Sequence, residues 1–242
     1  MEIPTILLIV VTFGFLIAER LWPGRQLPQS SGWYARALIL NLIQLGIVLF
    51  MGRLWVSIFA SSSLFSLRLL DWPLVEGFIA WFIGTFFFYW WHRLRHRGRW
   101  WEIFHQIHHS PKRIEILTSF YKHPFEIVVN SLLSLFILYP LLGVSISGAF
   151  WYNFFAATGE YFYHANLKSP GWLRYFIQTP QLHSIHHQRG VHRYNYGDIP
   201  LWDRLFGTYK DTVFFMKECG LEAEERLLAM LVFKEKKAQF KK

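Results

Sequence analysis

Four long apolar stretches constrain the fold of this chain more than any other feature of its sequence. They cover Ile3–Leu21, Trp33–Ala60, Trp72–Trp91 and Phe125–Ser147, and a shorter fifth stretch, Gly148–Tyr163, is richer in polar residues. A helix needs roughly 20 mostly apolar residues to cross a bilayer. Because 53% of the 242 residues are hydrophobic and only 17% are charged, too little polar sequence remains to cover such helices in water. The sequence therefore predicts an all-α integral membrane protein with four to five transmembrane helices and a cytosolic helical cap.

A single membrane domain is expected over residues 1–242, because no linker-like composition divides the sequence. Within it, we expect N-terminal transmembrane helices over 1–91, two histidine-rich cytosolic segments over 92–124, a transmembrane hairpin over 125–163 and the cytosolic cap with a basic tail over 164–242. The first apolar run has neither a basic flank before it nor an obvious small-residue cleavage site. It is therefore interpreted as a membrane helix and not as a cleaved signal.

The basic residues predict how the chain is oriented in the membrane. If the spans alternate, Glu19–Arg36, His92–Lys122 and everything after Tyr163 share one side, and these segments hold 23 of the 25 lysines and arginines. That side is expected to be cytoplasmic, in a bacterial inner membrane or the endoplasmic reticulum. The same bias explains the net charge of +9 without a nucleic-acid partner. The basic end, Glu222–Lys242, is expected either to lie as an amphipathic helix on anionic headgroups or to be a solvated tail.

Eight of the eleven histidines fall into three tight groups. The groups read His92-Arg-Leu-Arg-His96, His105-Gln-Ile-His108-His109 and His183-Ser-Ile-His186-His187. Since residues three and four apart share a helix face, each group is expected to present two or three imidazoles to one point. All three groups and His164 fall on the same predicted side of the membrane. Together they supply nine imidazoles, which is about twice what one ion can use, so two metal ions fit the number.

The kind of metal is less constrained by the residues themselves. The only cysteine is Cys219, so we expect neither an intramolecular disulfide nor a cysteine-held metal. Imidazole suits zinc, copper, iron and nickel alike. Zinc hydrolases of the H-E-x-x-H type need a glutamate after the first histidine. Arg, Gln and Ser follow the first histidine of the three groups, which disfavours that class.

Three further residues are candidates for the site. Glu160 lies four positions before His164 and shares its helix face, so it is expected to be a metal ligand, a partner of a ligand, or a polar residue near the end of a span. His123, directly before Pro124, and His192, after the third group, are additional candidate ligands.

At these residues the sequence resembles the fatty acid hydroxylase/sterol desaturase superfamily of integral membrane di-iron enzymes. The resemblance covers roughly residues 75–210 and includes the lone His164 and the closing segments Asn195-Tyr196-Gly197 and Trp202–Tyr209. It implies two iron ions, for which zinc can substitute in purified protein, and catalytic roles for Glu160, Asn195 and Asp203. Some relatives have histidine or glutamine where Glu160 stands, so a carboxylate here replaces a further imidazole. The metal ligands that the resemblance implies are His92, His96, His105, His108, His109, His164, His183, His186 and His187.

The resemblance also implies a reaction. With O₂ and externally supplied electrons, such an enzyme hydroxylates or desaturates an unactivated C–H position of a sterol, fatty acyl chain or related lipid. No heme- or flavin-binding module is visible in the sequence, so the electrons are expected from a cytochrome b5-, ferredoxin- or reductase-like protein. The alternative is a histidine-rich metal transporter or metal-binding membrane protein without oxygenase activity. Transport sites normally lie near the bilayer midplane, whereas these histidines cluster beyond the helix ends. An inactive scaffold is disfavoured because every matched histidine position is filled.

Overall fold

The described part of the chain is helical and carries four helices that are able to cross a membrane. A computed structural model describes residues 2–59 and 63–234, and within them no β-strand is assigned beyond one isolated bridge. The helices long and apolar enough to span a bilayer are Ile3–Leu21, Trp33–Leu54, Pro73–Arg95 and Pro124–Leu141. The predicted all-α integral membrane fold is therefore confirmed.

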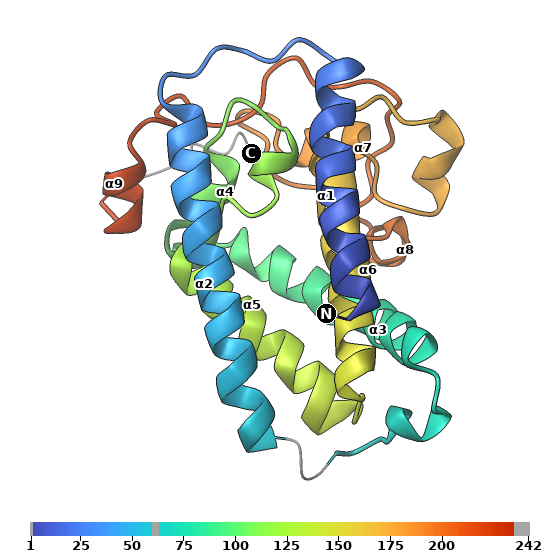
Figure 1. The fold of residues 1–242 in the computed structure, drawn as a ribbon. Helices are drawn as coiled ribbons and strands as arrows, with labels where there is room; N and C mark the ends of the chain where they lie inside the picture. The colour runs from blue at the N-terminus through green and yellow to red at the C-terminus, as the bar shows by residue number, and fades with distance from the viewer. Residues whose placement is uncertain (1, 60–62, 235–242) are drawn as a thin grey trace.

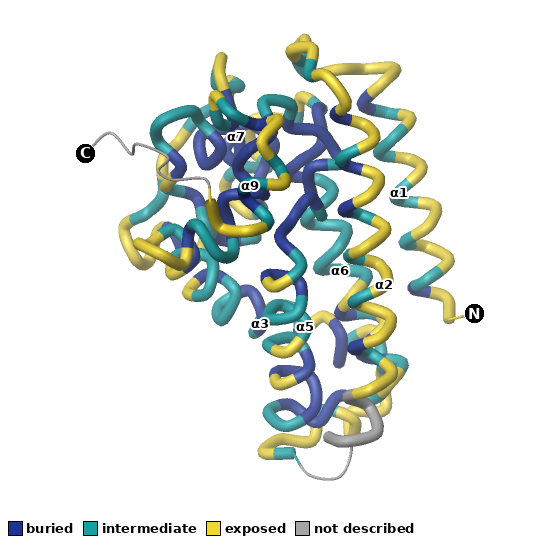
Figure 2. The backbone as a smooth tube through the Cα atoms, turned by 90° about the vertical axis from the view of Figure 1, so that its left-hand side faces the viewer, coloured by how far each residue is buried: buried dark blue, intermediate teal, exposed yellow. Residues whose placement is uncertain are grey.

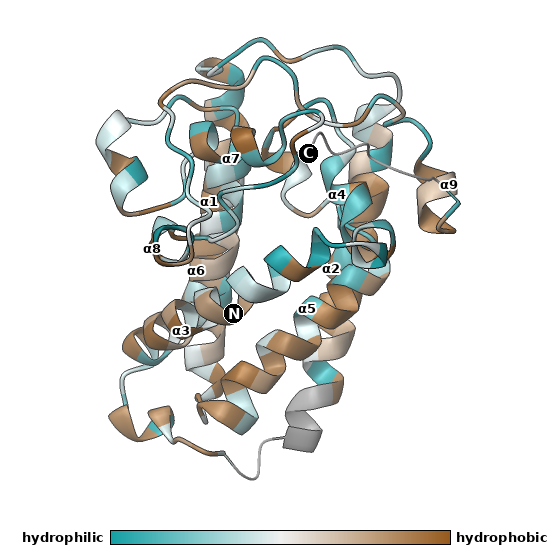
Figure 3. Cartoon of the chain, turned by 180° about the vertical axis from the view of Figure 1, so that it is seen from behind, coloured by the Kyte–Doolittle hydropathy of each residue, from teal (hydrophilic) through white to brown (hydrophobic). Residues whose placement is uncertain are grey.

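The long helices bring three connections to the same end of the molecule (Figure 1). The long helices are α1 (Ile3–Leu21), α2 (Trp33–Phe59), α3 (Pro73–Arg95), α5 (Pro124–Phe136) and α6 (Ile146–His164). A π-helical turn continues α5 over Ile137–Leu141. The segments that follow α1, α3 and α6 meet at the top of Figure 1, while the α2–α3 and α5–α6 connections lie at the opposite end. Figure 3 shows hydrophobic residues concentrated on the long helices and hydrophilic ones in the upper loops.

The upper end forms a cap of short helices and turns. Its helices are α4 (Gln106–His109), α7 (Pro180–His186), α8 (Pro200–Leu205) and α9 (Leu227–Leu231), with short turns at Trp101–His105, Ile116–Thr118 and Gly171–Tyr175 and one at the far end, Leu67–Leu70. Proline occupies the first turn of α3, α5, α7 and α8, where its missing N–H costs nothing. Figure 2 shows a buried centre in the cap with exposed loops around it.

The surface of α1 and α2 is apolar and exposed, in contrast to the cap (Figure 2). Val10 and Phe13 on α1, and Leu49 and Phe50 on α2, each expose 60–64% of their accessible area. An apolar surface of this extent is unfavourable in water. It fits helices that face lipid.

Two helix boundaries differ from the predicted ones for identifiable reasons. α3 continues past Trp91 to Arg95, so His92 lies in its last turn and not after it. α6 begins at Ile146, two residues before the predicted start, because the Ser145 side chain accepts a hydrogen bond from the Gly148 N–H and caps the helix. Gly143, with φ of +59°, turns the chain just before it, a conformation that glycine adopts without strain.

The predicted amphipathic helix over Glu222–Lys242 is only partly within the described residues. There it is reduced to α9, Leu227–Leu231, and its Met230 is buried in a cluster with Trp33 and Ile107. Leu227 and Leu231 also pack against this cluster, whereas Leu228 is 79% exposed. Residues 235–242, which contain most of the basic tail, lie outside the described residues.

Buried carboxylates fasten the first helix to the cap. Glu19, at the end of α1, accepts hydrogen bonds from the backbone N–H groups of Ile116 and Asn166 at 3.0 and 3.1 Å. Arg20 pairs with both Glu19 and Glu115. These contacts fix the loop that follows the second histidine group and the loop that follows His164.

Candidate metal centre

All nine predicted histidines converge in two adjoining groups. Within each group, one ring nitrogen of every member lies within 4.8 Å of the others. The five-histidine group contains His92, His96, His105, His109 and His186, and the four-histidine group contains His108, His164, His183 and His187. The groups share a boundary, since the rings of His109 and His187 stack with their centroids 4.1 Å apart.

Each H-x-x-H-H motif contributes to both groups, which refines the expectation that a motif faces a single point. His105 and His109 belong to the five-histidine group, while His108 between them belongs to the other. In the second motif the roles reverse, because His183 and His187 enter the four-histidine group and His186 enters the five-histidine group. Neighbouring side chains at i+3 and i+4 of a helix point about 100° apart, so one motif reaches both groups.

Backbone carbonyls hold three of the rings by their Nδ1 atoms. His92 Nδ1 donates to the Tyr196 carbonyl at 2.7 Å, and His186 Nδ1 donates to the Tyr194 carbonyl at 2.8 Å. His164 Nδ1 donates to the carbonyl of Glu160 at 2.9 Å. A carbonyl only accepts, so the Nδ1 atoms carry the proton and each Nε2 atom presents a lone pair to its group.

A buried ion pair holds a fourth ring. His105 Nδ1 lies 3.2 Å from both carboxylate oxygens of Glu126, which is fully buried in the first turn of α5. The same carboxylate pairs with Arg95 at the end of α3. An ionised Glu126 accepts a hydrogen bond from Nδ1–H, so His105 Nε2 also presents a lone pair. Such outer partners orient metal-binding imidazoles.

Neutral imidazoles alone cannot form a hydrogen bond at every close contact between these ring nitrogens. The Nε2 atoms of His92 and His105 are 2.9 Å apart, and neither carries a proton to place between them. In the other group, His183 Nε2 lies 3.0 Å from His164 Nε2 and 3.1 Å from His187 Nε2, and one proton on His183 serves only one of these contacts.

Protonation does not resolve the close contacts. Burial lowers the pKa of His109 well below its usual range and that of His186 to about 3. The Nε2 atoms of these two rings find no hydrogen-bond partner among the described residues. Cations held between the lone pairs would supply the missing partner, so the residues present fit two metal ions.

The other predicted site residues lie around the groups and not within them. The Glu160 carboxylate pairs with Lys122 and accepts a hydrogen bond from the Tyr163 hydroxyl. His192 places its Nδ1 3.1 Å from His109 Nδ1. His123 belongs to neither group, because it caps α5 by accepting from the Phe125 N–H and its Nε2 approaches the Leu231 carbonyl.

Asn195 and Asp203 shape the loop that carries the two carbonyl acceptors. Asn195 adopts a left-handed conformation, and its amide nitrogen donates to the Leu182 and Lys210 carbonyls. Asp203 accepts hydrogen bonds from the backbone N–H groups of Tyr196 and Gly197 and from the Thr208 hydroxyl. Their contacts position the loop, and a direct part in catalysis stays a prediction.

Sequence reasoning missed Glu126 and Arg95. The signal was present, because an ionisable residue at the start of an apolar helix is costly and marks a functional contact. Glu126 closely follows His123-Pro124, where the histidine is the more conspicuous candidate. Only the meeting of α3, the turn at Trp101–His105 and α5 reveals that the Glu126 carboxylate holds His105.

The sequence pattern of the fatty acid hydroxylase family matches residues 77–208, which include all nine histidines. The chain belongs to the fatty acid hydroxylase family. The matched region covers more than half of the chain and ends at Thr208, just after α8, which carries Asp203.

Similar proteins of known activity modify lipids. Alkylglycerol monooxygenase of Homo sapiens is 30% identical over 139 residues, covering 53% of this chain and 29% of that protein. Ornithine lipid hydroxylase OlsE of Rhizobium tropici is 29% identical over 144 residues, covering 57% of this chain and 43% of that protein. A very-long-chain aldehyde decarbonylase of Oryza sativa subsp. japonica is 29% identical over 154 residues, with coverages of 58% and 24%. The chain thus spans less than half the length of each. No solved structure is significantly similar to it.

Proposed function

We propose that this protein is a membrane-bound non-heme di-iron oxygenase that hydroxylates or desaturates an unactivated C–H position of a lipid. The observation that carries the proposal is the pair of adjoining imidazole groups whose Nε2 lone pairs face one another at 2.9–3.2 Å. The lipid-modifying relatives support the same chemistry. One ion is assigned to the five-histidine group and one to the four-histidine group.

Two bound irons supply O₂ activation and the removal of hydrogen from an unactivated C–H bond. The chain's own residues hold the ligands in place for this. The carbonyls of Tyr194 and Tyr196 and the carboxylate of Glu126 keep a proton on Nδ1 and aim Nε2 at the ions. The buried cap excludes water, which protects a reactive site from side reactions.

A hydrogen-bonded chain beside the four-histidine group is able to hold a proton. The Tyr163 hydroxyl lies 3.0 Å from a carboxylate oxygen of Glu160 and 3.0 Å from one of Asp198. The hydroxyl has one proton to offer two carboxylates. Loss of contact with water raises the pKa of Asp198 to about 6, so this carboxylate takes up a second proton as the pH falls toward that value. Lys122 neutralises Glu160.

The remaining parts of the proposal concern the surroundings of the site. The cap is proposed to face the cytoplasm, since the predicted basic segments lie there. The substrate is proposed to reach the site from the bilayer, and the electrons to come from a separate acidic protein attracted to the basic cap.

Metal analysis of the purified full chain tests the proposal. We expect two irons per chain in freshly prepared protein and O₂ uptake that requires both a reductant and a lipid. His105→Ala and His186→Ala are expected to lose iron and all turnover while still inserting in the membrane. The matched control is His123→Ala, which should keep both ions. Full iron content and activity in both ligand variants would refute the assignment, and metal binding without O₂ uptake would favour a metal-binding or transport protein.

A further inference from the structure

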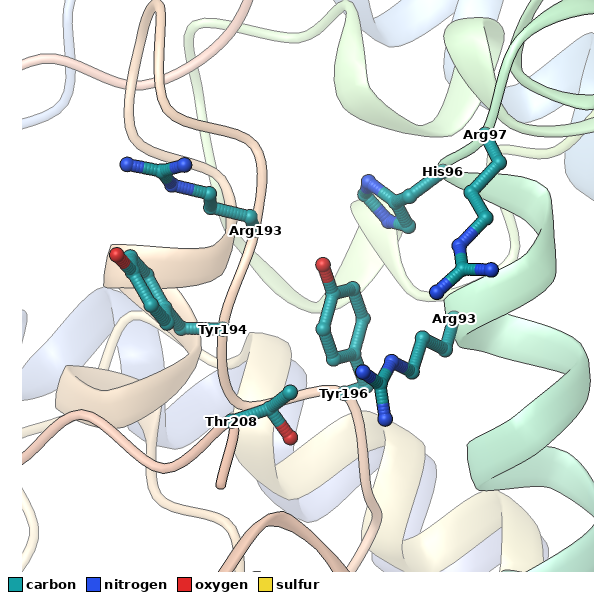
Figure 4. A pocket seen from close by; sticks show the side chains of 7 residues that line it. All are labelled: Arg93, His96, Arg97, Arg193, Tyr194, Tyr196 and Thr208. Carbon is teal, nitrogen blue, oxygen red and sulfur yellow. The ribbon is translucent and has the colours of Figure 1, made fainter. Parts of the chain in front are cut away.

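A basic hollow lies directly beside the five-histidine group (Figure 4). Its volume is about 210 Å³, and it is lined by Arg93, His96, Arg97, Arg193, Tyr194, Tyr196 and Thr208. Whole small-molecule ligands usually occupy roughly 300–1,000 Å³. The hollow therefore suits one polar group of a larger molecule.

Two of the lining residues connect the hollow to the metal centre. His96 is a member of the five-histidine group. The ring of Tyr196 packs against His96 and His186 with centroid separations of 5.1 and 5.4 Å, and its carbonyl accepts from His92. A group held in the hollow is thus separated from the proposed ions by a single layer of side chains.

The hollow is strongly positive. Figure 4 shows Arg193 on one side and Arg93 and Arg97 on the other, with His96 and Tyr196 between them. No acidic residue lines the hollow, and among the described residues none of the three guanidinium groups is within ion-pair distance of a carboxylate. Arginine favours carboxylate and phosphate because its donors match their oxygens in pairs.

Aromatic contacts hold two of the arginines in place. Arg93 donates to the Tyr89 hydroxyl and lies over the Trp90 ring. Arg193 lies over the Tyr194 ring at 5.0 Å. Asp203 interacts electrostatically with Arg93, but its carboxylate already accepts three hydrogen bonds, from the backbone N–H groups of Tyr196 and Gly197 and from the Thr208 hydroxyl. At least two positive charges therefore remain for a ligand.

The position of the hollow selects a lipid over a soluble anion. Arg93 is in the last turn of α3, which is long and apolar enough to span the bilayer as far as Arg95. The ends of such spans lie at the level of lipid headgroups. A hollow at this level is reached by the headgroup of a molecule whose chains stay in the membrane.

We propose that this hollow binds the phosphate or carboxylate of an anionic lipid substrate and so places the carbons that follow the headgroup beside the five-histidine group. The inference rests on the proposed oxygenase function, because it names the substrate class of that site. The hollow would select lipids with an anionic headgroup, which the histidines themselves do not do.

The test compares two ligands that differ only in the phosphate. Binding of palmitoyl lysophosphatidic acid and of palmitoyl monoacylglycerol to the full chain in neutral detergent is measured by calorimetry. We expect the phosphate to strengthen binding at least about tenfold. Arg97→Gln and Arg193→Gln should each remove most of this advantage and leave monoacylglycerol binding unchanged. Arg97→Lys should retain part of it. The matched control is Arg99→Gln, an exposed arginine two positions away that does not line the hollow.

Several outcomes would overturn the inference. Equal affinity for the two lipids, or the same loss in Arg99→Gln, would do so. Inorganic phosphate binding as tightly as the lysophospholipid would make the hollow a soluble-anion site. Normal lipid binding in Arg97→Gln together with slower reduction by an acidic electron-donor protein would assign the hollow to partner docking. Iron content and O₂ uptake are measured in the same samples. A protein that binds no iron but still prefers the phosphate-bearing lipid would refute the oxygenase proposal and support the anion site.

Discussion

At the residue scale, the candidate metal centre depends on which nitrogen of each imidazole keeps its proton. Acceptors that cannot donate, such as the Tyr194 and Tyr196 carbonyls, hold Nδ1–H and leave Nε2 free for a metal. Glu126 does the same for His105 and also neutralises Arg95. The carboxylate therefore has two separable tasks.

Replacing Glu126 should separate those tasks. In Glu126→Gln, Arg95 loses its buried partner, which typically costs about 3–5 kcal/mol of stability, and the His105 ring loses its charged acceptor. We expect a lower midpoint of thermal unfolding in detergent and reduced iron content.

The double variant Arg95→Met, Glu126→Gln serves as the control. It removes both charges, so most of the lost stability should return. Iron content should stay low, because His105 is still held by a neutral amide. Recovery of both quantities in the double variant would mean that Glu126 only balances Arg95.

At the element scale, the contact between α3 and α6 fixes the distance between the two histidine groups. α3 carries His92 of the five-histidine group, and α6 carries His164 of the four-histidine group. The helices approach closely at Gly77 and Gly148. A Cβ on Gly77 would lie 2.4 Å from the Trp151 Cβ and 2.6 Å from the Gly148 carbonyl oxygen. Small residues at such crossings allow membrane helices to pack backbone to backbone.

Gly77→Ala should therefore force α3 and α6 apart. Overpacking of this kind costs typically about 1–3 kcal/mol, so the unfolding midpoint and the iron content should both fall. Gly46→Ala on α2 is the matched control, because no described atom outside its own helix turn would lie within 4 Å of the added methyl group. Equal unfolding midpoints for the two variants would contradict the close helix contact.

At the scale of the whole molecule, a cap filled with buried neutral histidines makes folding sensitive to acid. Burial lowers the pKa of His186 to about 3 and that of His192 to about 4, whereas an unfolded histidine titrates near a pKa of about 6.5. The stability that these groups allow is fully present above about pH 6.5. It is lost as the pH falls from there toward the folded-state values, because only the unfolded chain takes up protons.

The metal-free protein should show this loss directly. Each such histidine contributes about 1.4 kcal/mol per pH unit between its two pKa values. We expect the thermal midpoint of chelator-treated protein to fall clearly between pH 7 and pH 5. An unchanged midpoint over this range would indicate that the histidines are solvated in the metal-free state.

The orientation of the whole molecule is open to a separate measurement. With the cap in the cytoplasm, alkaline phosphatase fused after Lys242 should be inactive in a bacterial host, while the same enzyme inserted in the connection between α2 and α3 should be active. The reverse pattern would place the histidine groups on the far side of the membrane and exclude a cytoplasmic electron donor.

The sequence by itself determined the membrane helices and the histidine inventory. Both are local signals: an apolar run such as Ile3–Leu21 gives a span of the observed bounds, and spacings of three and four put histidines on a helix face. The family resemblance rested on the same histidines and was confirmed.

Only the tertiary structure decided how those residues combine. Periodicity says which side chains share a face, but not which rings from other helices meet them. Three features join segments that are far apart in the sequence. Each H-x-x-H-H motif is divided between two groups, Glu126 holds the ring of His105, and Arg93 and Arg193 line the same hollow. Such contacts depend on how the helices pack as a whole, and no local pattern encodes them.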